Sequence, residues 1–172
     1  MGFLLLLPFF LVRFGLLSLL NRAAVQRAAY FAPMSAGERP AYLVYQLSNA
    51  AILLYPLFLS IRHTPTWVFA VGLGTYSAGL ILLILSTIHF AAPSESGINQ
   101  NGLYRFSRNP MYVSYFIFFV GCALLTQSAL LLFFVLVFQV SAHWIILAEE
   151  RWCLQTFGEE YRRYMTEVRR YL

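Results

Sequence analysis

The sequence predicts an all-α integral membrane protein with five transmembrane helices and a cytoplasmic C-terminal amphipathic helix. Of the 172 residues, 60% are hydrophobic and only 11% are charged. A soluble domain of this length has too little interior to bury that much apolar surface. The apolar residues also gather into separate runs, most of them close to the roughly 20 residues that cross a bilayer as a helix. We therefore expect residues 1–172 to form a single membrane domain.

Five apolar runs are the predicted spans, at residues 2–20, 41–61, 66–90, 111–125 and 128–148. The fourth run is short, and only a Thr-Gln-Ser turn separates it from the fifth, so these two are expected to form a tight antiparallel hairpin. The first run differs from a signal peptide, because it has no basic N-terminal region and carries Arg13 inside the apolar stretch. We interpret it as a retained helix whose Arg13 extends toward the same membrane side as Arg22.

Arginine positions orient the predicted bundle. Ten arginines fall in the loop after the first span, the loop after the third span and the C-terminal tail, which share one side if there are five spans. The opposite side carries Arg62 and His63. The positive-inside rule then places the N-terminus outside and the tail in the cytoplasm. We attribute the net charge of +5 to this topology and to contact with membrane lipids rather than to nucleic-acid binding.

The types of charged residue exclude several classes of site. All twelve basic residues are Arg and all seven acidic residues are Glu. The chain therefore has no Schiff-base lysine, no phosphate-loop lysine and no aspartate-based triad. Its two cysteines form no disulfide framework, and His63, His89 and His143 lack the spacing of metal ligands. No metal site is predicted, because the pair His143 and Glu150 has no third ligand nearby.

The loop at residues 91–110 leads into the first group of candidate functional residues. It ends in the run Gly102-Leu103-Tyr104-Arg105-Phe106-Ser107-Arg108-Asn109-Pro110-Met111-Tyr112. Asn109 is a favourable N-cap and Pro110 suits the first helical position, so we expect the fourth span to begin here. Capping does not account for two arginines and two tyrosines within nine residues. A helix N-terminus beside Arg105 and Arg108 suits a carboxylate or phosphate.

A pair of acids, Glu149 and Glu150, follows the fifth apolar run directly. Negative charge is unfavourable there, because the C-terminal end of a helix carries partial negative charge and the hydrocarbon edge is close. Two carboxylates at such a place indicate that they hold a cation.

The tail after the acidic pair is expected to form the amphipathic helix. Its apolar residues recur at steps of three and four, and Glu159 precedes Arg163 by four, a spacing that supports a helix. Gly158 is expected to break this helix in two. The tail either lies on the lipid headgroups or closes the cytoplasmic mouth of a pocket as a lid.

These residues resemble the isoprenylcysteine carboxyl methyltransferase family, whose core is shared by the membrane phospholipid methyltransferases. The resemblance covers about residues 98–172 and consists of two motif groups with an apolar hairpin between them. The residues that carry it are Gly102, Tyr104, Arg105, Arg108, Asn109, Pro110, Tyr112, Glu149, Glu150, Leu154, Phe157, Gly158, Tyr161 and Tyr164. Asn109 stands where the prenylcysteine enzymes usually carry histidine, and Asn-Pro-Met-Tyr is closer to the phospholipid N-methyltransferases.

The resemblance implies an S-adenosylmethionine-dependent methyltransferase that acts on a lipophilic small molecule or a lipid-modified acceptor. Residues 1–90 would form a three-helix part, and residues 91–172 would hold the cofactor-binding loop, the helical hairpin and the C-terminal lid helix. Arg105 and Arg108 are the expected catalytic residues, and one or the other would hold a carboxylate acceptor in line. The expected cofactor-binding residues are Gly102, Tyr104, Asn109, Pro110, Tyr112, Glu149 and Glu150, with the two acids meeting the sulfonium and ammonium groups.

Other interpretations stay open at this point. One is a phospholipid N-methyltransferase-like enzyme, and another is an NADPH-dependent reductase of the sterol-reductase type, which is similar in its Arg-His-Pro and Glu-Glu elements. A third is a non-catalytic membrane module. Gly72 and Gly74 either contact the cofactor or, with Gly79, form a small-residue packing face. The sequence does not determine the methyl acceptor or the oligomeric state.

Overall fold

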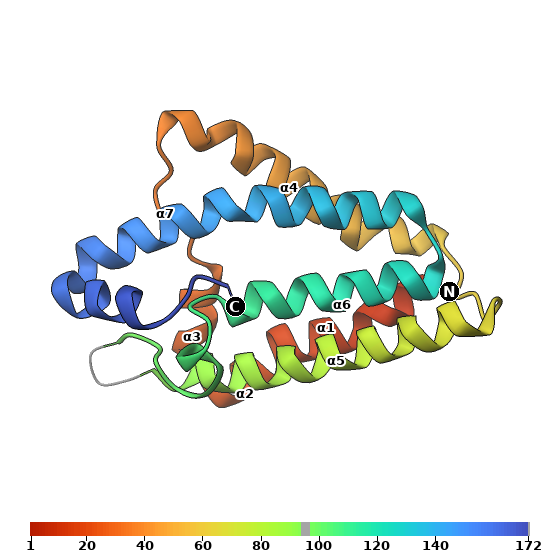
Figure 1. The fold of residues 1–172 in the computed structure, drawn as a ribbon, viewed down its shortest axis with the longest axis horizontal. Coiled ribbons are helices and arrows are strands. Elements are labelled where there is room, and N and C mark those ends of the chain that lie inside the picture. Colours follow the sequence, from red (N-terminus) through yellow and green to blue (C-terminus); the bar gives the residue numbers. More distant parts are fainter. Residues whose placement is uncertain (94–96, 172) are drawn as a thin grey trace.

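The computed structural model describes residues 1–93 and 97–171, and every regular element in these ranges is a helix. The all-α prediction is therefore confirmed for the described chain. Residues 94–96 of the predicted loop, and residue 172, lie outside the described residues. Figure 1 shows an elongated bundle in which the loop before α6 and the C-terminal segment lie at one end, and the α6–α7 turn lies at the other.

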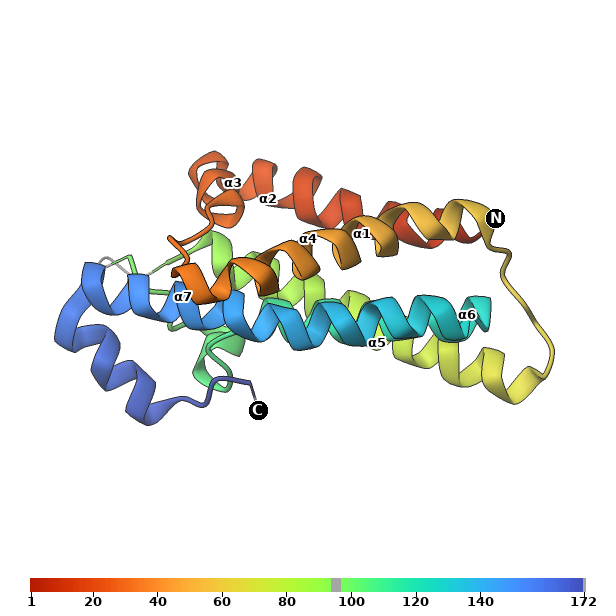
Figure 2. The ribbon, with the colours of Figure 1, turned by 90° about the horizontal axis from the view of Figure 1, so that it is seen from above.

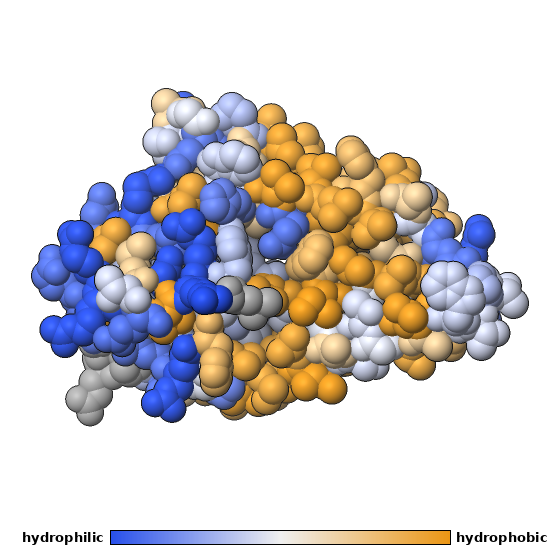
Figure 3. Space-filling view, viewed as in Figure 1, coloured by the Kyte–Doolittle hydropathy of each residue, from blue (hydrophilic) through white to orange (hydrophobic). Residues whose placement is uncertain are grey.

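Four helical segments of the described chain are long and apolar enough to cross a membrane: Gly2–Leu20, Ala36–Phe58, Thr66–Ala91 and Ala129–Glu167. A further apolar helix, α6 (Pro110–Thr126), has 17 residues. At 1.5 Å per residue it is about 26 Å long, slightly less than the roughly 30 Å of bilayer hydrocarbon. These helices fit a multi-pass integral membrane protein, and Figure 3 shows the apolar residues covering the bundle away from its polar end. Five crossings and an outside N-terminus stay predictions.

The first span is not a uniform α-helix. Between α1 (Leu7–Phe10) and α2 (Leu17–Leu20) the chain forms a π-helical stretch, Leu11–Leu16, which contains Arg13. Short π-helical segments are uncommon and occur often at functional sites. A short helix, α3 (Arg22–Ala29), follows at the polar end of the bundle, and α4 (Arg39–Leu54) then runs back along α7.

The backbones of α5 (Thr66–Ala91) and α6 approach each other through glycines. A Cβ at Gly79 would overlap the backbone of Phe118, and a Cβ at Gly121 would overlap the backbone of Tyr76. Gly72 also packs against α6, whereas Gly74 faces open space. Close contact through small residues is a common way to join helices in a membrane. The packing interpretation is therefore confirmed for Gly72 and Gly79.

The last helix, α7 (Ala129–Glu167), begins at Ser128, whose side chain accepts a hydrogen bond from the backbone N of Leu131. Its helical geometry breaks at Gly158 (φ 57°), which confirms the predicted break. A left-handed φ of this kind suits glycine, because it has no Cβ to clash. Beyond Gly158 the chain turns back toward the start of α6 (Figure 2), so that Tyr161 and Tyr164 bury against Ile98.

The glycine interface predicts how substitutions affect the bundle. Gly79→Ala and Gly121→Ala should each lower the free energy of unfolding by about 1–3 kcal/mol, because a methyl group must push α5 and α6 apart. Gly74→Ala is the matched control, on the same helix as Gly79, and should not destabilise the protein because Gly74 faces open space. Thermal unfolding of the three variants in detergent measures the difference, and equal stability of all three would contradict the packing role.

Candidate functional site

A cavity of about 520 Å³ lies at the polar end of the bundle. Its walls come from the first span, α3 and the segment that follows it, α4, the loop before α6, α6 and α7. This volume is typical of sites for small molecules. Of the residues that the sequence analysis selected, those that line the cavity are Tyr104, Arg108, Asn109, Tyr112, Glu149 and Glu150.

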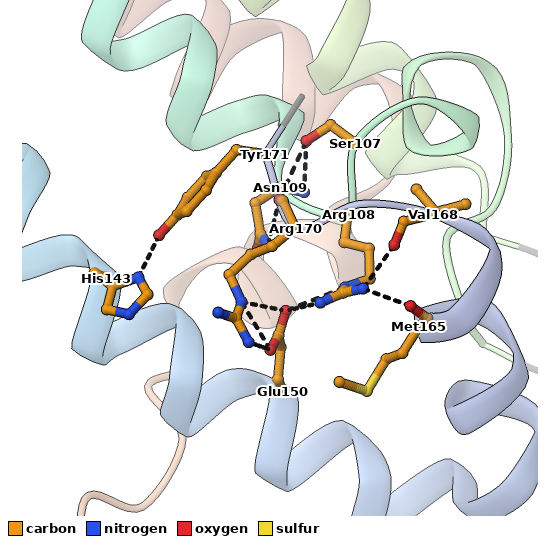
Figure 4. Close-up of polar contacts among 9 residues, drawn as sticks. All are labelled: Ser107, Arg108, Asn109, His143, Glu150, Met165, Val168, Arg170 and Tyr171. Atoms are coloured by element: carbon orange, nitrogen blue, oxygen red, sulfur yellow. Dashed lines mark hydrogen bonds and ion pairs between the residues drawn. The ribbon is translucent and has the colours of Figure 1, made fainter.

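Glu150 is bound by two arginines of the protein itself, as Figure 4 shows. Arg108 donates to Oε1 of Glu150 from Nε (3.1 Å) and Nη2 (2.8 Å). Arg170 approaches the same carboxylate from the C-terminal segment, with its Nη2 at 2.7 Å from Oε2. The side chains of Glu150 and Arg108 are only 5% and 6% exposed. The cation predicted for Glu150 is therefore supplied by the chain in this structure.

The segment 165–171, which we call the C-terminal strap, docks on the residues before α6. Nη1 of Arg108 donates to the backbone carbonyls of Met165 (2.9 Å) and Val168 (2.6 Å). The hydrogen bonds to Glu150 raise the pKa of Arg170, because they favour its charged form. Three further hydrogen bonds run from the residues just before α6 to carbonyl groups of the strap. Arg108 N donates to Arg169 O, Ser107 Oγ donates to Arg170 O, and Asn109 Nδ2 donates to Arg170 O.

Asn109 occupies the N-cap position of α6, but its side chain does not cap the helix. Its Nδ2 donates to the strap carbonyl of Arg170 at 3.0 Å instead. The prediction of a capping side chain was wrong, because a tertiary partner that is distant in sequence takes up the amide. Pro110 stands at the first helical position, as predicted.

Glu149 has a different hydrogen-bonding partner from Glu150. Its Oε1 accepts a hydrogen bond of 3.0 Å from the hydroxyl of Tyr112. No arginine of the described chain forms an ion pair with it. Glu149 is half-buried and lines the cavity, so its charge is available to a ligand there.

Three predicted site residues lie elsewhere. Gly102 has φ 55° and packs against the ring of His89, so that a Cβ would overlap that ring. Pro110 is buried at the start of α6, and Arg105 is exposed on the loop. None of the three lines the cavity. Gly102 and Pro110 shape the backbone around the cavity, whereas the side chain of Arg105 does not line the cavity.

Sequence reasoning missed several residues that line the cavity, among them Arg13 from the first span, Tyr45 from α4 and Tyr115 from α6. Arg13 gave a signal, since an arginine inside an apolar run is costly. Its Nη2 donates to the carbonyl of Ala28 at 2.6 Å. Tyr115 lies one helical turn beyond Tyr112, so it shares that face of α6. Tyr45 gave no signal, because tyrosines are common in membrane helices.

Other residues that line the cavity supply aromatic rings and a buried amide oxygen. Trp152 lies between Tyr30 and Phe157, with ring centroids 5.2 and 6.0 Å away. Oδ1 of Asn99 is buried and has no hydrogen-bond partner within residues 1–93 and 97–171. A buried acceptor of this kind suits a ligand that offers an N–H group.

A family model described as phospholipid methyltransferase matches residues 87–160. The match covers less than half of the chain, and it contains the loop, α6, most of α7 and both glutamates. This family is related to the isoprenylcysteine carboxyl methyltransferases. No curated protein and no solved structure is significantly similar to the chain. The matched region points to a membrane methyltransferase, which is a transferase enzyme.

The Glu150 ion pairs predict that Arg170 holds the strap. Arg170→Gln should speed amide hydrogen exchange in residues 165–171 about tenfold, because hydrogen bonds to a charged group contribute about 1.5–3 kcal/mol. Arg169→Gln is the matched control, since the side chain of Arg169 is exposed and only its carbonyl binds the loop. Exchange measured by mass spectrometry should not change in the control. Equal protection of the strap in both variants would contradict this role.

Proposed function

We propose that the protein is an S-adenosylmethionine-dependent membrane methyltransferase with a lipophilic acceptor, similar to the isoprenylcysteine carboxyl methyltransferases. One observation carries the proposal. Glu149 presents a carboxylate to a cavity of suitable size, within the region that matches the family model, and it has no arginine partner in the described chain. A ligand with a sulfonium and an ammonium group satisfies that carboxylate.

The residues around the cavity fit such a cofactor. The carboxylate of Glu149 suits its cationic centres, and the aromatic faces of Tyr112, Trp152 and Phe157 attract cations through their π-systems. The unpaired Oδ1 of Asn99 suits the amino group of an adenine. When bound, the cofactor supplies an electrophilic methyl group.

In catalysis the protein positions the reactants and shields them from water. A carboxylate acceptor needs no general base, whereas a phospholipid amine must first lose its proton; in either case the chain must hold the acceptor in line with the methyl group and exclude water. The apolar helices around the cavity suit a hydrocarbon tail that enters from the bilayer. A lipophilic carboxylate and a phospholipid headgroup both fit this description, and the acceptor is one of this class.

The predicted roles of Glu150, Arg108 and Arg105 change in this proposal. Glu150 and Arg108 act as positioning residues, because their charges satisfy each other and fasten the C-terminal strap. Tyr104, Asn109 and Tyr112 keep their place beside the cofactor. Arg105 receives no role at the acceptor, since its side chain is exposed on the loop. An NADPH-dependent reductase and a non-catalytic module gain no support from the family match.

Calorimetric titration of the purified protein tests the cofactor directly. S-adenosylmethionine and S-adenosylhomocysteine should bind, and NADPH should not, because the family match is to methyltransferases and the carboxylate of Glu149 suits a cationic ligand rather than a polyphosphate. Binding of NADPH without binding of S-adenosylmethionine would overturn the proposal in favour of the reductase.

Glu149→Gln should weaken binding of S-adenosylmethionine at least tenfold, which corresponds to about 1.4 kcal/mol, because the substitution keeps the shape and removes the charge. Tyr112 still finds an oxygen acceptor on the glutamine. Glu159→Gln is the control, since Glu159 is an exposed acid on the same helix. An unchanged dissociation constant in Glu149→Gln would remove the observation on which the proposal rests.

A further inference from the structure

Arg13 lines the cavity, and the site described so far does not use its charge. It lies on the π-helical stretch of the first span and is partly buried. Its guanidinium donates to the carbonyl of Ala28 (2.6 Å) and approaches the sulfur of Met111 (3.6 Å). No carboxylate in residues 1–93 and 97–171 forms an ion pair with it. An arginine inside an apolar span normally has a partner of opposite charge.

Tyr115 adds a second donor to the same part of the cavity. It is 8% exposed, and its hydroxyl is buried without a hydrogen-bond partner in the described chain. Buried polar groups are nearly always paired, so the missing partner points to a ligand. Arg13 and Tyr115 both line the cavity and both have hydrogens to donate. The group that completes this pair is an acceptor with negative charge.

Glu149 does not supply that negative charge. Its carboxylate is close enough to interact electrostatically with Arg13, but it is hydrogen-bonded to Tyr112 rather than to the guanidinium. The cavity therefore holds a carboxylate and a guanidinium that form no ion pair with each other. Such a separation suits two ligand groups of opposite charge.

We propose that Arg13 and Tyr115 form an anion subsite for the acidic group, a carboxylate or phosphate, of the lipophilic acceptor. The assignment rests on the proposed function. The acceptor is favoured over the carboxylate of the cofactor because of where the two donors lie. Tyr115 is a turn further into α6 than Tyr112, and Arg13 belongs to an apolar span, so the subsite lies among membrane helices. The features that suit the cofactor, including Asn99 and Trp152, belong instead to the loop before α6 and to α7.

Only one of the two subsite residues lies in the region that the family model matches. Arg13 precedes the matched region by more than seventy residues, whereas Tyr115 lies within it. Specificity for an acidic acceptor thus depends on the first span. Replacing Arg13 should weaken binding of the acceptor while the cofactor still binds.

Binding of tritiated lipids to the full chain in nanodiscs, measured by scintillation proximity, tests the subsite. One arm uses oleate with oleyl alcohol as the neutral competitor, and the other uses phosphatidate with diacylglycerol. At least one acid should bind and resist its neutral competitor. Arg13→Gln should weaken that binding about tenfold and Tyr115→Phe about threefold, as expected for loss of charge-assisted hydrogen bonds. Arg22→Gln, an exposed neighbour on the same side, should have no effect.

The outcomes separate the two proposals. Calorimetry should show that Arg13→Gln binds S-adenosylmethionine at least as tightly as the wild type does, because the substitution removes a positive charge near Glu149; such binding also shows that the variant is folded. Loss of cofactor binding with acid binding retained would overturn the subsite, as would acid binding that neither substitution alters. If Arg13→Gln does not fold, Arg13→Lys and Tyr115→Phe decide by the same criteria. A wild type that binds an acid through Arg13 but no S-adenosylmethionine keeps the subsite and refutes the methyltransferase.

Discussion

The buried carboxylate of Glu150 holds the polar end of this bundle together. A charge in that position is costly unless it is paired and hydrogen-bonded, and here Arg108 and Arg170 both donate to it. These arginines come from the loop before α6 and from the C-terminal strap, so a single carboxylate joins three segments that are distant in sequence. The same contacts hold the loop beside α7, where it forms a wall of the cavity.

Adjacent glutamates acquire different surroundings because a helix turns by about 100° at each residue. Glu150 points toward the strap and is neutralised by arginines, whereas Glu149 contacts Tyr112 and faces the cavity. A feature that looks like one acidic pair in the sequence is therefore two sites. One stabilises the fold and the other is left for a ligand, which is why the proposed function depends on Glu149.

The two halves of the chain contribute different chemistry to the cavity. The region that matches the family model supplies the loop, both glutamates and the aromatic residues Tyr112, Trp152 and Phe157. The first span and α4 supply Arg13 and Tyr45. Close packing of α5 on α6 through Gly79 and Gly121 fixes the position of α6 between these parts. The cavity consequently exists only when helices from both halves are assembled.

Apolar run length and composition were sufficient to determine the helical membrane class, because the bilayer requires backbone hydrogen bonds to be made within each helix. The break at Gly158, the start of α6 at Pro110 and the presence of Glu149, Tyr112 and Tyr104 at one site also followed from local pattern and motif order. The partners of the charged residues did not follow. Arg108 and Arg105 look equivalent in the sequence, yet one is buried on Glu150 and the other is exposed. Only the tertiary structure decides this, since the ion pairs join residues 20 and 42 positions apart and depend on how the strap folds back.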